Sequence, residues 1–150
     1  MPSIGNRQSA IGNAPLAWDK PEDWDELPAS GMRLAAFTVG GAECTIISLP
    51  GNVGGLEANI ERWAGQIGAP ATHEALHPFM DSAEPFETTA GDAGQLFDFQ
   101  KLSFETEQSI LAGIIKIGQM TVFVKMTGTP DTLNAERDKL LTLCQSIQKK

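Results

Sequence analysis

Two histidines four residues apart, in the segment His73-Glu74-Ala75-Leu76-His77, form a literal H-E-x-x-H pattern. On a helix, this spacing places both imidazoles on one face, where they can bind zinc while the glutamate activates a water molecule. His73 and His77 are the only histidines of the chain, so a third ligand would have to be a carboxylate. The nearest carboxylates after the pattern are those of Asp81, Glu84 and Glu87. The pattern therefore allows a zinc hydrolase with His73 and His77 as ligands and Glu74 as the base.

Two prolines bracket this pattern and weaken that hypothesis. Pro70 lies before it, and Pro78 directly follows the second histidine, where proline removes a backbone donor and its ring disfavours a helix. We therefore predict a short helix that is capped by Thr72 and interrupted at Pro78, which is too short to hold two ligands rigidly. The preferred interpretation is a solvated short helix without a metal, and the zinc hydrolase remains the alternative hypothesis.

A second group of polar residues lies beside a tryptophan further upstream. At about 100° per residue, Asn59, Arg62 and Gln66 fall along one flank of a helix, next to Trp63. Three hydrogen-bonding side chains beside an indole form a recognition edge for a protein or a small ligand. The alternative is a structural role, in which Arg62 pairs with a carboxylate and Asn59 bonds to the backbone of a neighbouring loop. The carboxylates in question are those of Glu61, Glu22 and Asp23.

Two further tryptophans, Trp18 and Trp24, lie on either side of Pro21. Because proline restricts its neighbours, we expect this segment to run irregularly over the domain surface and to be anchored by burial of the indoles. One hypothesis joins both indoles to the flank of Asn59, Arg62 and Gln66 in a single partner-binding surface. The alternative leaves them as core or lid residues, because an indole carries a large apolar area.

The segment Gly51-Asn52-Val53-Gly54-Gly55 precedes the helix that carries Asn59, as a phosphate-binding loop would. It lacks the lysine and the serine or threonine of a P-loop, and it does not fit the dinucleotide pattern. Its glycines are therefore interpreted as serving a tight turn from strand to helix. Residue spacing also supports no Ser-His-Asp or Cys-His arrangement, so we predict neither a catalytic residue nor a cofactor.

The chain has 150 residues and a formal net charge of −8 at pH 7. This charge repels phosphate backbones and anionic headgroups, so neither nucleic acid nor a membrane surface is expected as a partner. The first residues are polar and contain no apolar run, which predicts neither a signal peptide nor a membrane-inserted helix. Cys44 and Cys144 lie in apolar segments and are expected to be buried thiols.

Apolar periodicity assigns these candidates to elements. Six strands are predicted, at 32–39, 42–49, 86–89, 95–100, 109–117 and 120–127. The strands at 32–39 and 109–117 are apolar on both alternating sets, which is typical of strands covered on both faces. The strands at 109–117 and 120–127 are predicted at the centre of the sheet. Two long helices are predicted, one from Val53 to Ile67 that Gly68 ends, and one that begins at Asp131 or Thr132.

These elements predict an α/β (α+β) fold, a three-layer α/β/α sandwich with a central, mainly antiparallel sheet of about six strands. Residues 1–15 mix Ser, Gly, Asn and Pro without periodicity and are predicted to be a disordered N-terminal tail. Residues 16–150 are predicted to be one domain, because their number is the usual size of a single hydrophobic core.

Several local strings, in their order along the chain, resemble the PsbP-like family, whose superfamily also contains the Ran-binding Mog proteins. The strings are W-x-x-P-x-x-W at 18–24, Met32-Arg33, Leu-Pro-Gly at 49–51, Asn59-x-x-Arg62-Trp63-x-x-Gln66-x-Gly68, Lys125-Met126-Thr127-Gly128 and Cys144-Gln145-Ser146-Ile147. The resemblance spans most of residues 16–148. Within it, the piece from Trp18 to Gly68 looks most like bacterial envelope proteins and lipoproteins of this fold.

The resemblance implies an α/β/α sandwich and a role in binding or assembly without catalysis. It also favours the periplasm or cell envelope as the compartment, although this sequence does not contain the lipobox cysteine of exported relatives. We therefore hypothesise a non-catalytic binding or assembly module whose partner is a protein or a small ligand. The partner-binding residues of this hypothesis are Asn59, Arg62, Trp63, Gln66, Trp18 and Trp24.

Overall fold

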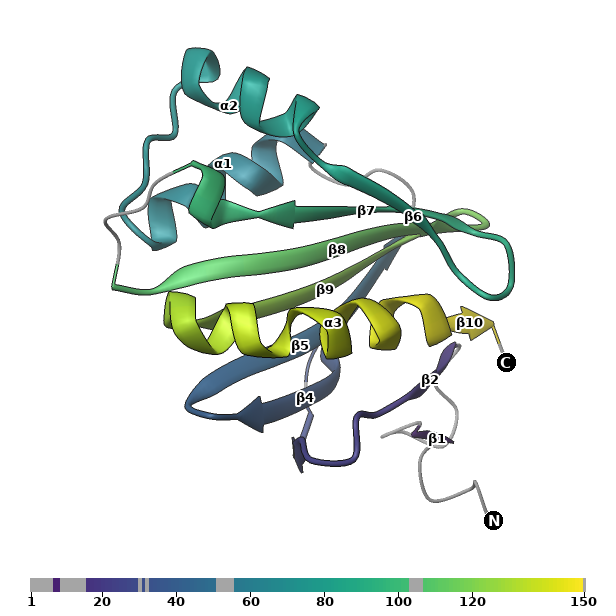
Figure 1. The fold of residues 1–150 in the computed structure, drawn as a ribbon. Helices are drawn as coiled ribbons and strands as arrows, with labels where there is room; N and C mark the ends of the chain where they lie inside the picture. The colour runs from purple at the N-terminus through teal and green to yellow at the C-terminus, as the bar shows by residue number, and fades with distance from the viewer. Residues whose placement is uncertain are drawn as a thin grey trace.

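Antiparallel strands form the centre of the computed structural model, which describes residues 7–8, 16–29, 31, 33–50, 56–102 and 107–149. Seven strands make one sheet in the order β3-β4-β5-β9-β8-β7-β6, and each is antiparallel to its neighbours (Figure 1). Their bounds are β3 Asp25–Leu27, β4 Arg33–Val39, β5 Ala42–Pro50, β6 Glu84–Glu87, β7 Ala93–Asp98, β8 Ser109–Ile117 and β9 Met120–Gly128. Most neighbours in this order are consecutive in the chain, so the sheet is built largely from hairpins.

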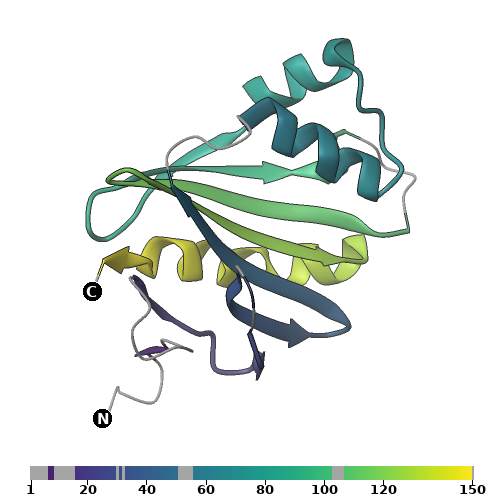
Figure 2. The ribbon, with the colours of Figure 1, turned by 180° about the vertical axis from the view of Figure 1, so that it is seen from behind.

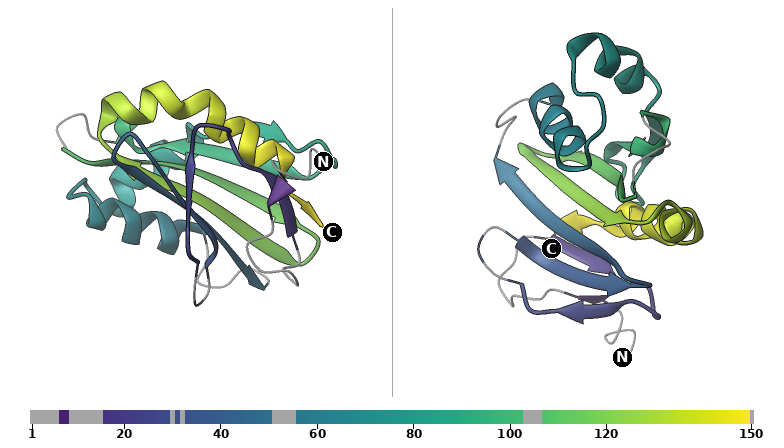
Figure 3. Two further views of the ribbon diagram at one scale, coloured as in Figure 1. Left: turned by 90° about the horizontal axis from the view of Figure 1, so that it is seen from below. Right: turned by 90° about the vertical axis from the view of Figure 1, so that its left-hand side faces the viewer.

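Three helices cover the sheet on both faces. α1 Leu56–Gln66 and α2 His73–Asp81 lie on one face, and α3 Pro130–Ser146 lies on the other (Figures 2 and 3). A short 3-10 helix, η2 Phe99–Lys101, follows β7. The predicted α/β/α sandwich with a mainly antiparallel central sheet is therefore confirmed. In the described part of the chain, no helix combines the length and the apolar character needed to cross a membrane.

Each face of the sheet has its own apolar core, because successive residues of a strand point to opposite sides. In β8, Leu111 and Ile115 belong to the core under α3, whereas Ile110 and Ile114 belong to the core under α1 and α2. β9 is the middle strand of the seven, and β8 lies beside it. The predicted central position of 109–117 and 120–127 is therefore confirmed, whereas 32–39, which is also apolar on both sets, forms β4 next to the edge strand β3.

The sheet has one strand more than predicted, and a second sheet has the order β1-β2-β10. In that second sheet, β1 Arg7–Gln8 and β10 Gln148–Lys149 both pair with β2 Leu16–Asp19. The expectation that the segment around Trp18 runs irregularly is thus wrong for residues 16–19, which form β2. Pairing with distant segments satisfies the backbone N–H and C=O groups of this strand. Apart from Arg7 and Gln8, the predicted tail at 1–15 lies outside the described residues.

Turn and cap residues act largely as their types predict. Gly40 and Gly41 have φ values of 56° and 85°, as a primed two-residue hairpin requires, and Gly68 follows α1 with φ of 75°. Thr72 caps α2, because its Oγ1 accepts a hydrogen bond of 3.2 Å from the backbone N–H of Ala75. The predicted start of α1 near Val53 lies outside the described residues.

The helix α2 continues through Pro78 to Asp81, so the predicted interruption at Pro78 is wrong. Leu76 and Phe79 are both buried against the sheet, and the ring of Phe79 lies 4.8 Å from that of Phe99 between centroids. This packing holds the helix together although proline lacks one backbone donor. Tertiary contacts therefore override a local helix-breaking signal here.

Candidate functional site

Four of the sequence-predicted residues lie along one side of α1 and line a single cavity. Asn59, Arg62, Trp63 and Gln66 meet strands β4, β5 and β9 around a volume of about 240 Å³. From the strands, the cavity is lined by Arg33, Thr45, Ile47, Leu49, Phe123 and Lys125. We call this cavity the α1 pocket.

Asn59 and Arg62 form a hydrogen-bonded pair on the helix side of the α1 pocket. Asn59 is only 5% exposed, and its Oδ1 accepts a hydrogen bond of 2.7 Å from Nη2 of Arg62. Residues three apart are neighbours on a helix surface, so α1 itself brings the two side chains together. Among the described residues, none of the carboxylates of Glu61, Glu22 and Asp23 forms an ion pair with Arg62. The guanidinium has five N–H donors, and the bond to Asn59 uses one of them.

Lys125 lines the α1 pocket on the side of the sheet. Its Nζ lies 5.3 Å from the ring centroid of Trp63 and donates a hydrogen bond of 2.8 Å to Oε1 of Gln66. Trp63 is buried and packs edge-on against Phe123, with 5.8 Å between the ring centroids. The ammonium group is therefore held at the indole by a hydrogen bond and a cation–π contact.

Arg33 reaches the same pocket because of a β-bulge at the start of β4. Arg33 pairs with Ile47 while Ala35 pairs with Ile46, so Leu34 is an extra residue in β4. With regular alternation, Arg33 would point to the same face as Ala35, which belongs to the core under α3. The bulge moves Arg33 to the opposite face, where it lines the α1 pocket.

Three cations thus line one pocket of a chain whose net charge is −8. Burial lowers the pKa of Lys125, the nearby charges of Arg62 and Arg33 lower it further, and Glu43 opposes them. In the part of the chain that the structure describes, no carboxylate forms an ion pair with any of the three cations. The α1 pocket therefore favours a negatively charged group.

Trp18 and Trp24 lie on the other face of the sheet, in the core under α3. Both are fully buried, as expected, and Nε1 of Trp24 donates a hydrogen bond of 2.9 Å to Oε1 of Glu136. The structure does not bring them together with Asn59 and Arg62, because the sheet lies between the two groups. The hypothesis of one joint surface is therefore corrected to two separate locations.

The histidines of the H-E-x-x-H pattern lie one turn apart on α2, with their ring centroids separated by 5.9 Å. Both are exposed, as is Glu74. Nδ1 of His73 is 3.0 Å from Oε2 of Glu57, and Nδ1 of His77 is 3.9 Å from Oδ2 of Asp81. Over the described ranges, no three His, Cys, Asp or Glu side chains form a group that could hold a metal ion. The pattern thus supplies two imidazoles without a third ligand from that part of the chain.

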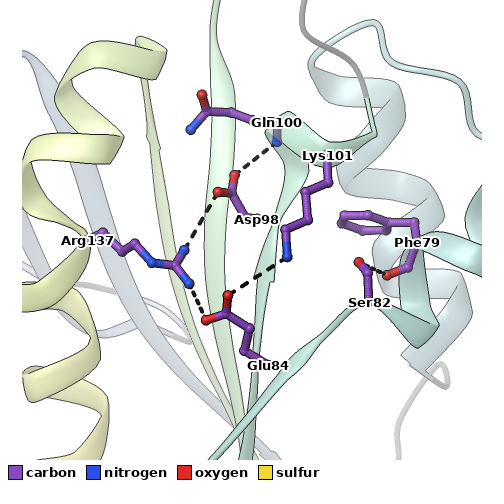
Figure 4. Close-up of polar contacts among 7 residues, drawn as sticks. All are labelled: Phe79, Ser82, Glu84, Asp98, Gln100, Lys101 and Arg137. Carbon is purple, nitrogen blue, oxygen red and sulfur yellow. Dashed lines mark hydrogen bonds and ion pairs between the residues drawn. The ribbon is translucent and has the colours of Figure 1, made fainter.

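Glu84, considered above as a third ligand, belongs instead to an ion-pair cluster between α3 and the edge of the sheet (Figure 4). Its carboxylate contacts Nη2 of Arg137 and lies 3.8 Å from Nζ of Lys101. Asp98 lies 3.6 Å from Nη1 of Arg137 and accepts a hydrogen bond of 3.0 Å from the backbone N–H of Gln100. The cluster therefore links α3 to β6, β7 and η2, which is a structural role.

No protein-family model matches this sequence, and no curated protein is similar to it in sequence. Solved structures, in contrast, are similar to it in fold. One is the solution structure of cyanobacterial PsbP (CyanoP) from Synechocystis sp. PCC 6803, with a TM-score of 0.55 and 11% identity over 96% of this chain and 91% of that chain. The chain has a PsbP-like fold.

A second structure with this PsbP-like fold is a crystal structure of a protein from Bacteroides thetaiotaomicron VPI-5482. Its TM-score is 0.52 and its identity is 15%, over 91% of this chain and 47% of that chain, so this chain spans about half of it. At these identities the similarity establishes the fold alone. The fold that the resemblance implies is therefore confirmed, and the α1 pocket has to be interpreted from its own residues.

Within the PsbP-like sheet, Lys125 and Arg33 are the charged lining residues that sequence reasoning does not assign to the site. Lys125 had a usable signal, because a lysine in a strand predicted at the sheet centre indicates a polar site on a face that should be buried. Arg33 had none, since simple alternation assigns it to the wrong face and no residue pattern marks the bulge at Leu34. The predicted turn at 51–55 lies outside the described residues.

Proposed function

We propose that this protein is a non-catalytic binding or assembly module whose partner contacts the α1 pocket. The observation that supports this proposal is the convergence of Asn59, Arg62, Trp63 and Gln66 with two cations from the sheet in one cavity. The lining residues come from one helix and three strands, so the site exists only in the folded domain. Such a convergence of polar groups around an aromatic ring is typical of a binding site.

The chemistry of the lining favours binding over catalysis. Guanidinium, ammonium, amide and indole groups orient and neutralise a ligand, whereas acid–base catalysis near neutral pH relies mainly on histidines and carboxylates. None of the described residues that line the α1 pocket is His, Cys, Asp or Glu. The lining therefore favours holding a partner over transforming it.

The polar groups of the pocket are also held in place before a partner arrives. Arg62 is fixed by its bond to Asn59, and Lys125 is fixed by Gln66 and the ring of Trp63. Side chains that are already ordered lose less conformational entropy when they bind. This favours a dedicated binding site over a set of solvated surface charges.

Affinity capture with a matched pair of variants tests the proposal. The double variant Arg62→Ala/Gln66→Ala should still fold and unfold cooperatively in urea, because both side chains are exposed. It should retain its native partner at least about tenfold less well, since the loss of one charged contact is worth about 1.4 kcal/mol or more.

The control variant is Gln100→Ala/Lys101→Ala, which also removes one amide and one cationic side chain, in the region of the ion-pair cluster of Figure 4. It should capture the partner as the wild type does. Equal capture by the wild type and the Arg62→Ala/Gln66→Ala variant would contradict the assignment of the surface.

A further inference from the structure

We propose that the α1 pocket binds a carboxylate carried on a short apolar or aromatic group. This inference rests on the proposed function and names the chemical class of the ligand. Two features of the pocket support it. Three cations line it and form no ion pair with a carboxylate among the described residues, and apolar side chains lie beside them.

The cations supply the recognition of the anionic group. Arg62 presents a planar set of N–H donors that matches the two oxygens of a carboxylate. The bond from Arg62 to the buried Asn59 fixes one side of the guanidinium and leaves other donors for a ligand. The ammonium of Lys125, held at Trp63, adds a second positive charge on the sheet side.

The charges of Arg62 and Arg33 are close enough to act on Lys125 in the pocket that all three line. Burial lowers the pKa of Lys125 most, Arg62 and Arg33 lower it further, and the carboxylate of Glu43 opposes them. Like charges so arranged repel in the empty pocket, and an anion between them would relieve the repulsion. This is the expected electrostatic state of a site that awaits a negatively charged ligand.

The apolar floor distinguishes an organic acid from an inorganic anion. Ile47, Leu49 and Phe123 line the pocket together with the indole of Trp63. A bare phosphate or chloride would leave this surface uncovered, whereas an apolar body attached to the carboxylate would bury it. The volume of about 240 Å³ equals the share of roughly eight water molecules in the liquid, which limits that body to a small group.

Isothermal titration and backbone NMR of the full chain test this proposal with sodium benzoate, sodium hexanoate, benzamide and inorganic phosphate as probes. Benzoate and hexanoate should saturate and shift amide signals of α1, β5 and β9. Benzamide, which has the ring without the charge, and phosphate, which has the charge without the ring, should each bind at least about tenfold more weakly.

Two variants locate the binding. Arg62→Gln should weaken benzoate binding by about tenfold or more, since a charge-assisted hydrogen bond is lost. Lys101→Gln, which removes a cation outside the pocket, should leave the affinity unchanged. The proposal is overturned if benzoate binds no tighter than benzamide, or if Arg62→Gln binds it as the wild type does.

Two sources can present this chemistry, a free organic acid and the C-terminal residue of a polypeptide. The dipeptide N-acetyl-Gly-Phe with a free carboxylate, compared with its C-terminal amide, separates them. Tighter binding of the free dipeptide than of benzoate, with loss of binding on amidation, supports a polypeptide terminus, and tighter binding of benzoate supports a free acid.

Failure of the carboxylate proposal can be distinguished from failure of the proposed binding function. If the acids fail to bind while partner capture still depends on Arg62 and Gln66, the carboxylate is the wrong ligand and the binding module stands. If capture is also independent of these two side chains, both proposals fall.

Discussion

The ammonium of Lys125 reports on the electrostatics of the α1 pocket. Burial, Arg62 and Arg33 lower its pKa from the ordinary value of 10.5, so removing one of the two charges should raise it again. We predict that Arg62→Gln moves the pKa of Lys125 back toward 10.5. NMR titration of the lysine side-chain ε signals measures this directly, with Lys101→Gln as the control that removes a distant cation. Equal pKa values of Lys125 in the wild type and in Arg62→Gln would show that Arg62 does not act on Lys125.

Cys44 and Cys144 are both buried under α3, and burial raises the pKa of both thiols, that of Cys144 to about 12. A free thiol has an ordinary value of 9.0, so the unfolded chain loses these protons first. The stabilising effect of the two protonated thiols is complete below pH 9. That of Cys144 is lost as the pH rises toward 12, and that of Cys44 as the pH rises well above 9. We predict that the free energy of unfolding falls through this window, by at most ~1.4 kcal/mol per pH unit for each thiol.

Urea unfolding between pH 8 and pH 10 checks the prediction for the thiols. A Cys44→Ala/Cys144→Ala variant should be less stable overall and should show a shallower decline, because it has no thiol to titrate. The prediction fails if both proteins lose stability equally over this range. Ellman's reagent at pH 8 should in addition react with the folded wild type only as fast as the chain opens, since thiolates are the reactive form.

At the level of single elements, α2 shows how packing outweighs a local signal. Pro78 lies inside the helix and is exposed, while Leu76 and Phe79 on the other side are buried. We predict that Pro78→Ala raises the free energy of unfolding by about 1 kcal/mol or more, because it restores a backbone donor in the helix interior. Urea unfolding measures the change, and Pro70→Ala, outside the helix, is the matched control. A lower stability of Pro78→Ala would mean that the proline ring contributes packing of its own.

The elements also explain what the sequence can and cannot predict. The two-sided apolar pattern of 109–117 identifies β8 as a strand covered on both faces, and the spacing on α1 identifies Asn59, Arg62 and Gln66 as one flank, because both depend on fixed periods of the backbone. The bulge at Leu34 breaks that period, so it hides Arg33. Strands β2 and β10 escape prediction for another reason, since each pairs with a segment at the opposite end of the chain.

For the whole molecule, the sheet separates the proposed binding site from the described segment 16–24. The α1 pocket lies on the face of α1 and α2, and the segment from Leu16 to Trp24 packs against α3 on the other face. There, the backbone N–H of Asp19 donates a hydrogen bond of 2.9 Å to Oγ of Ser146, and Nζ of Lys139 lies 2.6 Å from Oδ2 of Asp23. The stability of the fold therefore depends on this segment, while the proposed ligand contacts do not.

The place where the folded domain begins follows from this arrangement. Among the described residues, a variant that starts at Leu16 loses the pairing of Arg7 and Gln8 with β2, and we expect its free energy of unfolding to stay within about 1 kcal/mol of the wild type. A variant that starts at Asp25 also loses two fully buried indoles, those of Trp18 and Trp24. Each large aromatic side chain removed from a core costs about 3–5 kcal/mol, against a total stability of roughly 5–15 kcal/mol for a domain.

We therefore predict that the chain from 16 to 150 unfolds cooperatively in urea and that the chain from 25 to 150 does not. Circular dichroism in the far and near ultraviolet measures both, because a loosely packed chain keeps backbone signal and loses the aromatic signal. Cooperative unfolding of the shorter chain at the wild-type midpoint would mean that α3 and the sheet form a complete core without the indoles. In that case the segment from Leu16 to Trp24 would be an appendage, and its buried tryptophans would have to serve something other than stability.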